Sequence, residues 1–490
     1  MVDSKLDIAR PRAPLSLLPG VPQRVHLIGA GGAGVSGAAR ILVAHGHSLS
    51  AQDRAESEHL AALRALGVPV RVGTDSGRLD EQVELVVRSA AVGDDDPQVA
   101  DAQERGVPVI KYGQMLGRLG PADRTLGIAG THGKTTTSWM MYHALRGLES
   151  FLGDVPRAGA LVGGICRELA TNAIAPEPEG WFAVEACEYD RTFLQLAPRG
   201  AVVTNVEEDH LDYYGDFDSI KGAFARFADR IRPDGLLVIG TDVPRRVEEA
   251  ARCTVWRLGH ELEITLLGER AGCFSFALRG PDFEVPRIDL GVPGAFNVEN
   301  AALALGLVIG LVAPACGAGG RTAALAAARG LESFKGCHRR FESWGSHGSI
   351  EVVHDYAHHP TEVRVTLEAA RRALPGRSLH VLFQPHQHSR TARFLAEFIE
   401  CLRFADRVVV TEVYGARTHI DGEVTAGAQD IADGLVAAGV RSVAPGGLEA
   451  SLPSFVDGLP ENCAALVLGA GDVGHIRDEL FRQLALRGPA

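Results

Sequence analysis

The sequence predicts an α/β fold in which parallel sheets are covered by helices. Short apolar runs of strand length alternate with helical stretches along the chain, a pattern typical of parallel sheets with helical crossovers. Several of these runs lead directly into glycine-rich or acidic segments, as strands do where they end in ligand-binding loops. The chain of 490 residues is too long for one ordinary core, and roughly 150 residues per domain indicates about three domains.

Residues 1–123 are expected to form the first domain. Its strand candidates are 25–28, the region of Leu49, 85–87 and the pair 109–110. Pro108 precedes the last pair, and proline is tolerated at the start of a strand. Residues 117–123 contain Gly120 and Pro121 and have the composition of a linker.

Two further domains are expected over residues 124–336 and 337–490. Their strand candidates are 125–129, 181–184, 201–204, 236–239, 350–353, 379–383, 408–413 and 464–468. The longest apolar run, 301–316, contains Pro314 and is shorter than the about 20 residues that a membrane-spanning helix needs. We therefore expect a buried helix there.

Composition restricts the class of partner. The net charge of -12 argues against a general affinity for nucleic acid or anionic membranes, so anionic ligands must be held by local groups. The eight cysteines include no Cys-x-x-Cys pair, and the chain begins without the basic and apolar regions of a signal peptide. These features favour a cytoplasmic protein with reduced thiols.

The segment 130–137, Gly-Thr-His-Gly-Lys-Thr-Thr-Thr, predicts a nucleoside triphosphate site. It joins a strand candidate to residues 138–145, which suit a helix, and a helix N-terminus attracts polyanions. The glycines let the backbone approach phosphate oxygens. Lys134 can reach the outer phosphates, and Thr135 or Thr136 can offer a hydroxyl group to Mg²⁺.

This loop is a shortened variant of the general phosphate-loop pattern. Ile128 stands where that pattern has its first glycine, five residues before Gly133. A helix-capping turn that binds nothing is the alternative, and the Gly-Lys-Thr-Thr sequence at a strand-helix junction disfavours it.

A second glycine loop follows the first strand candidate. Gly29, Gly31 and Gly34 have the spacing of the fingerprint for a diphosphate, and Asp53 closes the next strand where a ribose-binding carboxylate is expected. Taken alone, these residues make NAD the first interpretation. A tight strand-helix turn without a ligand remains the alternative.

Acidic residues follow two strands of the second domain. Glu185 comes directly after 181–184, and the segment 205–210 after 201–204 ends in His210. Ligands gather at the carboxyl ends of parallel strands, so both side chains can face the Lys134 loop. Oxygen ligands with one imidazole suit Mg²⁺, whereas the other acids of this segment are expected in a solvated loop.

Two pairs of polar residues have both structural and functional interpretations. Asn297 and Asn300 precede the buried helix and are most simply helix caps, although an amide can also pair with an adenine edge. Arg339 and Arg340 stand beside the second domain boundary, where an arginine could meet phosphate. A surface arginine pair is the commoner explanation.

Three clusters rich in histidine or arginine stand at or after strand ends: 354–360, 383–391 and 414–417. Five histidines would suit zinc, but no cysteine lies near them and their spacing fits no closed site. Recognition of a small ligand is favoured instead. Arg390 or Arg417 can bind a carboxylate, and His358 or His386 can hydrogen-bond near a reacting group. His354 is expected in the core.

Together these segments resemble the Mur ligases, the ATP-dependent amide-forming enzymes of peptidoglycan precursor synthesis. The resemblance covers nearly the whole chain, and its most specific marks are 130–137, 209–212, 355–362 and 383–386. It implies a Rossmann-like N-terminal domain for a UDP-sugar, a central P-loop ATPase-like domain with a parallel sheet, and a Rossmann-like C-terminal domain that acts as a lid for an amino acid.

The resemblance also implies roles for individual residues. It changes the expected ligand of the first glycine loop from NAD to a UDP-sugar. The UDP-sugar residues would be Gly29, Gly31, Gly32, Gly34, Ser36, Asp53 and Ser89. The ATP residues would be Gly130, Thr131, His132, Gly133, Lys134, Thr135, Thr136, Asn300, Arg340 and Asp355. The Mg²⁺ ligands would be Thr135, Glu185 and His210. The amino acid and substrate carboxylate would meet Tyr356, His386, Arg390 and Arg417. The catalytic set would be Lys134, Glu185, His210, His358 and His386.

The implied reaction begins when ATP phosphorylates the lactyl carboxylate of UDP-N-acetylmuramic acid. The amine of L-alanine then attacks the acyl phosphate. A ligase that recycles a preformed peptide, an NAD-dependent dehydrogenase with an ATPase domain and a non-catalytic nucleotide switch remain alternatives. We expect small-molecule partners only, no nucleic acid or membrane partner, and a monomer or homodimer.

Two positions depart from the family pattern. Cys187 stands where an aspartate is common, and Gln387 stands where arginine is frequent. Lys221 is the nearest lysine after the Asp-His motif, but its spacing is shorter than that of the carbamylated lysine in several Mur ligases. No such role is assigned to it.

Overall fold

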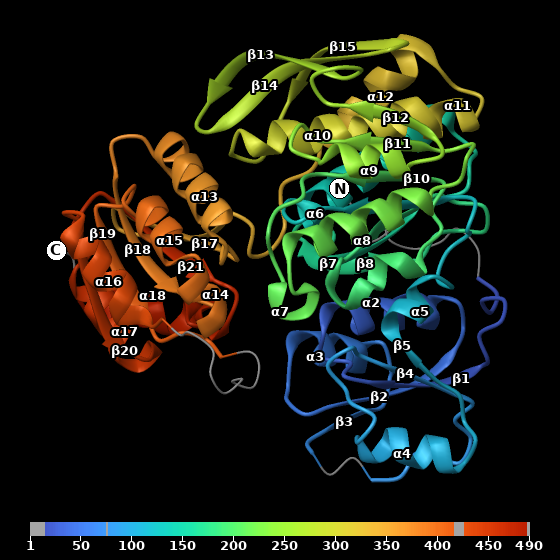
Figure 1. Cartoon of the computed structure of the whole chain (residues 1–490), viewed down its shortest axis with the longest axis horizontal. Helices are drawn as coiled ribbons and strands as arrows, with labels where there is room; N and C mark the ends of the chain where they lie inside the picture. Colours follow the sequence, from blue (N-terminus) through green and yellow to red (C-terminus); the bar gives the residue numbers. More distant parts are fainter. Residues whose placement is uncertain (1–14, 75–76, 416–425, 488–490) are drawn as a thin grey trace, which may run out of the picture. The chain divides into compact units, whose positions relative to one another are not determined.

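The computed structural model describes residues 15–74, 77–415 and 426–487, which form an α/β protein as predicted (Figure 1). The chain divides into two compact units. The first runs to Leu267 and also includes Phe276–Asp289 and Glu299–Lys335. The second consists of Gly268–Ser275, Leu290–Val298 and the chain after Lys335.

The first sheet has five parallel strands in the order β3-β2-β1-β4-β5. Its strands are β1 (Arg24–Ile28), β2 (Ser48–Asp53), β3 (Val70–Val72), β4 (Leu85–Arg88) and β5 (Val109–Lys111). Its helices are α2 (Ala33–Ala44), α3 (Glu58–Ala65), α4 (Pro97–Glu104) and α5 (Tyr112–Leu116). The central strand β1 is buried after its first residue, which places the glycine loop that follows it at the carboxyl edge of the sheet.

The second sheet has seven strands in the order β12-β11-β10-β6-β9-β7-β8 and is parallel except for β8. Its strands are β6 (Thr125–Ala129), β7 (Gly159–Cys166), β8 (Thr171–Ile174), β9 (Phe182–Glu185), β10 (Gly200–Val203), β11 (Leu236–Ile239) and β12 (Thr254–Arg257). Its helices are α6 (Lys134–Leu152), η1 (Tyr189–Gln195), α7 (Leu211–Tyr214), α8 (Phe217–Asp229) and α9 (Arg245–Ala250). The strand β6, which precedes the phosphate loop, is fully buried between β10 and β9.

A three-stranded sheet and an apolar helix follow. The sheet consists of β13 (Glu263–Arg270), β14 (Cys273–Gly280) and β15 (Phe283–Asp289). The helical segments are α10 (Phe296–Leu307), the π-helical turn η2 (Val308–Val312), α11 (Ala313–Ala315) and α12 (Gly320–Glu332). Among the described residues, Phe296–Ala315 alone is long and apolar enough to cross a membrane, but 78% of its apolar window is buried in the fold. This is the buried helix that the sequence predicts.

The third sheet has six strands in the order β16-β17-β21-β18-β19-β20, and only its edge strand β16 is antiparallel. Its strands are β16 (Glu342–His347), β17 (Ile350–Asp355), β18 (Ser378–Gln384), β19 (Arg407–Thr411), β20 (Arg441–Gly446) and β21 (Cys463–Gly469). Its helices are α13 (Pro360–Ala373), α14 (His388–Arg393), α15 (Leu395–Leu402), α16 (Ala428–Ala437), α17 (Leu448–Asp457), η3 (Asp472–His475) and α18 (Arg477–Leu486).

The third sheet is covered on both faces, as expected for a largely parallel sheet. Leu466 and Leu468 of β21 belong to a core with residues of α13, α15 and α16. The intervening Ala465 and Val467 belong to a second core with residues of α17 and α18. Successive side chains of one strand therefore serve opposite faces.

Every strand candidate from the sequence overlaps an observed strand, and the ends differ by at most two residues. Nine observed strands were not predicted from the sequence: β3, β7, β8, β12 to β16 and β20. The cap interpretation of the two asparagines is wrong, because α10 begins at Phe296. Asn297 and Asn300 therefore lie inside the helix, and Asn297 donates to the carbonyl of Pro293 at 2.7 Å.

The first two sheets share one hydrophobic core. Leu27 and Ile41 belong to the same buried cluster as Leu161 and Phe193. At the junction, the Asn172 amide of β8 donates to the Ala33 carbonyl at the start of α2, with a distance of 2.8 Å. The helix of the first glycine loop is thus fixed to the second sheet.

Helices α6 and α12 approach each other through two glycines. A Cβ on Gly147 would lie 2.3 Å from the Ala326 carbonyl oxygen and 2.7 Å from the Gly330 Cα. A Cβ on Gly330 would lie 2.3 Å from the His143 carbonyl oxygen. The obstructing atoms belong to the backbone, so neither position can gain a side chain unless a helix moves.

We predict that Gly147→Ala lowers the free energy of unfolding by about 2 kcal/mol, because overpacking outweighs the higher helix propensity of alanine. Gly222→Ala in α8 is the matched control, because its nearest foreign atom lies 3.5 Å away, on the flexible Arg246 side chain. The control should be neutral or up to about 1 kcal/mol more stable. Urea denaturation followed by circular dichroism measures both. Equal stability of the two variants would contradict the tight helix crossing.

Candidate functional site

The backbone of the phosphate loop between β6 and α6 requires glycine at two positions. Gly130 has φ +136°, and a Cβ there would lie 1.9 Å from the Thr204 hydroxyl oxygen. Gly133 has φ +82°, and its Cβ would lie 2.6 Å from Asn300 Oδ1. Helix α6 then begins at Lys134 without a side-chain cap. Its first N–H groups are therefore suited to an anion.

Lys134 folds back under this loop. Its Nζ donates to the carbonyls of Gly130 at 2.6 Å and Thr131 at 2.9 Å, and it lies 2.9 Å from Glu188 Oε2. Burial by itself lowers the pKa of Lys134, but the carboxylate charges of Glu188 and Glu185 reverse this effect and leave the pKa above its ordinary value. The loop thus contains a permanently charged ammonium group.

Glu188 is a further residue of this site that was not predicted from the sequence. Its side chain is only 4% exposed, although it belongs to a short acidic segment that reads as a surface loop. Its Oε1 lies 3.9 Å from His210 Nε2. Glu188 therefore links Lys134 to the predicted metal ligand His210.

The segment after β10 holds the phosphate loop in place. The Thr131 N–H donates to the Asn205 carbonyl at 3.0 Å, and the His132 N–H donates to Asn205 Oδ1 at 2.8 Å. The Thr204 hydroxyl donates to the His132 carbonyl at 2.6 Å. The Thr131 hydroxyl accepts from the Glu207 N–H at 2.8 Å. Thr204 and Asn205 were not assigned from the sequence, although polar residues at a strand end were the available signal.

Glu185 and Thr135 bring two oxygen ligands together. The Thr135 hydroxyl donates to Glu185 Oε2 at 3.0 Å, and the Gly163 N–H donates to the same oxygen at 2.8 Å. A Cβ on Gly163 would lie 2.9 Å from Glu185 Oε1. A hydroxyl and a carboxylate are the hard donors that Mg²⁺ prefers. Thr136 lies in the same first turn of α6 and is half-buried.

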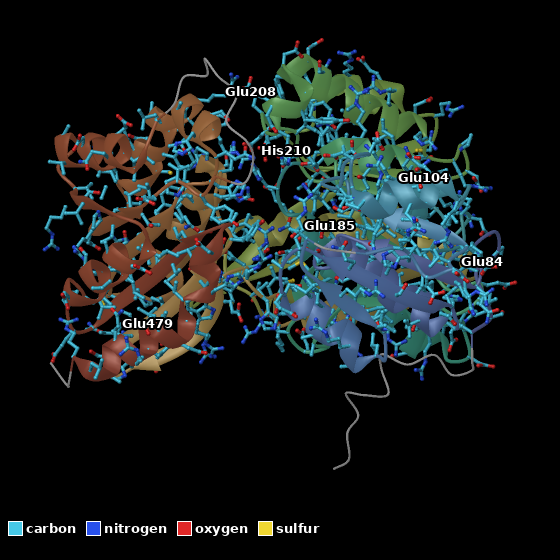
Figure 2. All side chains as sticks on the ribbon, turned by 90° about the horizontal axis from the view of Figure 1, so that it is seen from below. Glu84, Glu104, Glu185, Glu208, His210 and Glu479 are labelled. Atoms are coloured by element: carbon cyan, nitrogen blue, oxygen red, sulfur yellow. The ribbon has the colours of Figure 1, made fainter. Side chains whose placement is uncertain are left out.

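His210 has an uncommon backbone conformation, with φ +51° at the start of α7. Its ring lies 5.2 Å from the Tyr189 ring, and its Nε2 lies 3.7 Å from Asp209 Oδ2. Figure 2 labels His210 together with Glu185 and Glu208. The acidic groups around this imidazole suit a cation.

Cys187 changes the charge of this region. Burial, followed by the charge of Glu188, raises the pKa of Cys187 to about 12. The side chain is therefore a neutral thiol at physiological pH, where an aspartate would add a negative charge.

The first glycine loop uses its glycines for close packing. A Cβ on Gly29 would lie 2.7 Å from Ser89 Cβ, and one on Gly34 would lie 2.8 Å from the Tyr112 ring. Gly32 is the N-cap of α2 and provides no side-chain cap. Ser36 is fully buried, and its hydroxyl donates to the Ala33 carbonyl at 3.1 Å.

Asp53 acts on the backbone of the same loop. Its Oδ2 accepts from the Gly31 N–H at 2.7 Å, and its Oδ1 accepts from the Arg54 N–H at 2.6 Å. A Cβ on Gly31 would lie 2.8 Å from Oδ2. The carboxylate therefore fixes the loop in this structure.

In the second unit, Asp355 is buried at the end of β17. Its oxygens accept from the N–H groups of Phe341 at 2.7 Å and Ala357 at 2.8 Å. The Arg340 guanidinium lies over the Tyr356 ring at 5.2 Å, and its Nη1 is 3.7 Å from Glu362 Oε1. These contacts gather three of the predicted residues at one strand end.

The histidine clusters meet because β17 and β18 end at the same edge of the third sheet. The rings of His358 and His386 lie 5.5 Å apart, and the His386 ring stacks on Tyr414 at 5.8 Å. The nearly buried Arg390 places its Nη1 3.3 Å from His386 Nδ1. Arg417 lies outside the described residues.

His354 is a core residue, as expected. It is 1% exposed, and its Nδ1 lies 2.9 Å from the Val467 carbonyl oxygen. Gln387 has φ +70°, which is uncommon for a residue other than glycine. Its N–H donates to the Tyr414 carbonyl at 2.9 Å.

Comparison with known proteins gives a consistent set of matches. Residues 24–124 match the model of the Mur ligase family catalytic domain, residues 128–308 that of the Mur ligase middle domain, and residues 339–473 that of the Mur ligase glutamate ligase domain.

Two curated relatives match over nearly the whole chain, and both are UDP-N-acetylmuramate--L-alanine ligases. The protein from Rubrobacter xylanophilus is 37% identical over 94% of this chain and 100% of its own length. The protein from Mycolicibacterium smegmatis is 38% identical over 96% of this chain and 97% of its own length. The crystal structure of UDP-N-acetylmuramate-alanine ligase from Thermotoga maritima matches with a TM-score of 0.75 and 25% identity, over 95% of this chain and 99% of that one.

We predict that the carboxyl group of Asp355 titrates near pH 6. Burial raises its pKa to about 6 from an ordinary value of 3.8, against the opposing effects of Arg340 and of the Phe341 N–H. Between about pH 4 and about pH 6, the folded protein therefore retains a proton on Asp355 that the unfolded chain has lost. The contribution of Asp355 to the free energy of unfolding thus falls as pH rises from about 4 to about 6 and is constant above that range.

Carboxyl carbon NMR as a function of pH measures this midpoint. Arg340→Gln should raise it further, because a positive charge that favours the carboxylate is removed. Arg403→Gln is the control, because Arg403 lies exposed at the C-terminal end of α15 and pairs with the exposed Glu400. A midpoint below pH 4 would contradict the burial of this group.

Proposed function

The chain belongs to the Mur ligase family, and we propose that it joins L-alanine to the lactyl carboxylate of UDP-N-acetylmuramic acid with the hydrolysis of ATP to ADP and phosphate. The full-length similarity to relatives with this activity supports the substrates. The observation that carries the chemistry is the charged Lys134 ammonium beneath a glycine loop at a helix N-terminus. The recycling ligase and the dehydrogenase are not favoured.

ATP is needed because a carboxylate is a poor electrophile. In the first step a carboxylate oxygen bonds to the γ-phosphorus, the bond to the β-γ bridging oxygen breaks, and ADP leaves. In the second step the amine nitrogen of alanine bonds to the acyl carbon, the bond from that carbon to the phosphate oxygen breaks, and phosphate leaves. The amine gives up a proton in forming the amide.

The phosphate loop supplies positioning and positive charge to the first step. The N–H groups at the start of α6 and the Lys134 ammonium would hold the phosphates while charge develops on the transferring group. Thr135 and Glu185, with His210, would hold Mg²⁺, which neutralises phosphate charge when bound. Asn300 lies against Gly133 and would contact the nucleotide.

Each domain has its own proposed ligand. Residues 1–123 would bind the UDP-sugar through the uncapped start of α2, with Ser89 close to Gly29. Residues 124–336 would bind ATP. Residues 337–490 would bind the amino acid, with Arg390 and His386 near its carboxylate.

The substrates are small molecules, and we place the protein in the cytoplasm as a monomer or homodimer. Nucleic acid and membranes have no role in the proposed reaction.

We predict that phosphate release from ATP requires both UDP-N-acetylmuramic acid and an amino acid, and that L-alanine is the best of the amino acids tested. A phosphate-release assay with each amino acid in turn measures this. A preference for a tripeptide would indicate the recycling ligase instead. ATP consumption that is independent of any amine would contradict ligation.

Lys134→Ala tests the phosphate loop within the same assay. Turnover should fall by at least about 100-fold, because a group that stabilises transition-state charge is lost. Binding of the UDP-sugar should stay unchanged. Lys221→Ala is the control, because Lys221 pairs with Asp218 on α8. Retained turnover in Lys134→Ala would contradict the assigned ATP site.

Glu185→Gln should raise the Mg²⁺ concentration needed for half-maximal activity by at least about tenfold. The amide can still accept the hydrogen bonds from Thr135 and Gly163, but it lacks the negative charge. Glu249→Gln on the exposed side of α9 is the matched control. A Mg²⁺ titration of the ligase rate measures the change, and an unchanged dependence in Glu185→Gln would remove this residue from the metal site.

A further inference from the structure

Three metal-binding side chains of different chemistry meet beside α6, outside the proposed catalytic residues. His143 lies on α6, Cys166 ends β7, and Glu168 lies in the turn that joins β7 to β8. Their ligand atoms all lie within 4.8 Å of one another. His143 and Cys166 are buried, and the Glu168 side chain is 18% exposed. The group is therefore mostly enclosed and reachable from the Glu168 side.

The separations within this group are close to those between neighbouring ligand atoms of a zinc site. Cys166 Sγ lies 3.7 Å from His143 Nε2 and 3.4 Å from Glu168 Oε2, and His143 Nε2 lies 3.6 Å from Glu168 Oε1. Zinc bond lengths of about 2.3 Å to sulfur and about 2.0–2.1 Å to nitrogen or oxygen give tetrahedral edges of about 3.3–3.6 Å. Each measured separation lies within a few tenths of an ångström of these values. Glu168 faces His143 with Oε1 and Cys166 with Oε2, so the cation would bind one of these oxygens or both.

The hydrogen bonds around His143 turn the correct nitrogen toward the group. The Ser333 hydroxyl donates to the Gly330 carbonyl at 2.6 Å, so its oxygen accepts the proton of His143 Nδ1 at 2.9 Å. In the neutral ring this leaves Nε2 with a lone pair directed at Cys166 and Glu168. Metal-bound histidines are oriented by such a bond from their other nitrogen.

The centre of the group has more hydrogen-bond acceptors than hydrogen-bond donors. The lone pair of His143 Nε2 faces a carboxylate oxygen, and only the weak thiol donor of Cys166 lies between them. The Lys335 N–H donates to Glu168 Oε1 at 2.5 Å and orients the carboxylate without filling the centre. A cation would satisfy all three ligand atoms together.

We propose that His143, Cys166 and Glu168 form a binding site for a thiophilic divalent cation of the zinc class, with the fourth position open to water. The combination of a thiolate, an imidazole and a carboxylate favours zinc over Mg²⁺, which prefers oxygen ligands. The bound cation would tie α6 to the β7–β8 turn. Because Ser333 and Lys335 hydrogen-bond to His143 and Glu168, the cation would also stabilise the position of the last residues of the first unit.

Co²⁺ and Zn²⁺ binding to the full-length protein test this proposal, with excess Mg²⁺ present to compete at the proposed ATP site. We expect about one equivalent of Zn²⁺ per chain. With Co²⁺ in its place, we expect a thiolate-to-metal charge-transfer band. Cys166→Ser should abolish that band. Cys187→Ser should retain it, which distinguishes the site from the neighbourhood of Glu185.

Glu168→Gln provides a second, milder variant. The amide can keep the hydrogen bond from Lys335, but it removes a charged ligand, so Zn²⁺ affinity should fall at least about tenfold. The melting temperature without metal should stay unchanged, and the increase caused by Zn²⁺ should shrink. Three results would overturn the site: no thiolate band in the original protein, a band that survives Cys166→Ser, or an unchanged Zn²⁺ affinity in Glu168→Gln.

Discussion

The buried ammonium group of Lys134 is the constraint on which the phosphate loop depends. A buried charge is tolerated only with close partners, and this one has a carboxylate and two backbone carbonyls. Because Gly130 and Thr131 both present their carbonyls to Nζ, the loop must fold back on itself. Gly130 has a φ suited to glycine and no room for a side chain. The Lys134 charge thus accounts for the course of the loop, and close packing against Thr204 accounts for glycine at position 130.

The two glycine loops share a construction and differ in charge. Each follows a buried central strand and leads into a helix without a side-chain cap. In the first loop a carboxylate, Asp53, holds the Gly31 N–H. In the second an ammonium group holds two carbonyls. In the proposed function, the fixed cation suits a triphosphate whose terminal group is transferred, and the loop without a cation suits a diphosphate that only anchors its ligand.

Local sequence could predict the buried strands and the glycine loops, because both depend on residues adjacent in the chain. It could not predict β13, because the side chains of this strand are mostly exposed. The neighbouring strand β14 could have been predicted, because its buried residues Phe274, Phe276 and Leu278 alternate along the chain. Glu188 reads as a surface acid, and only the tertiary fold buries it against Lys134. The proximity of His358 and His386 could be predicted roughly, because both follow parallel strands and such strands end at the same edge of a sheet.

The shared core beneath the first two sheets has a consequence for how the protein loses its structure. Because packing continues from one sheet to the next, we expect the two sheets to open together as one cooperative unit. The bond between Asn172 and the start of α2 lies within that unit. The two glycine loops are therefore expected to share a common resistance to local opening. Damage beneath either loop would raise the hydrogen exchange of both.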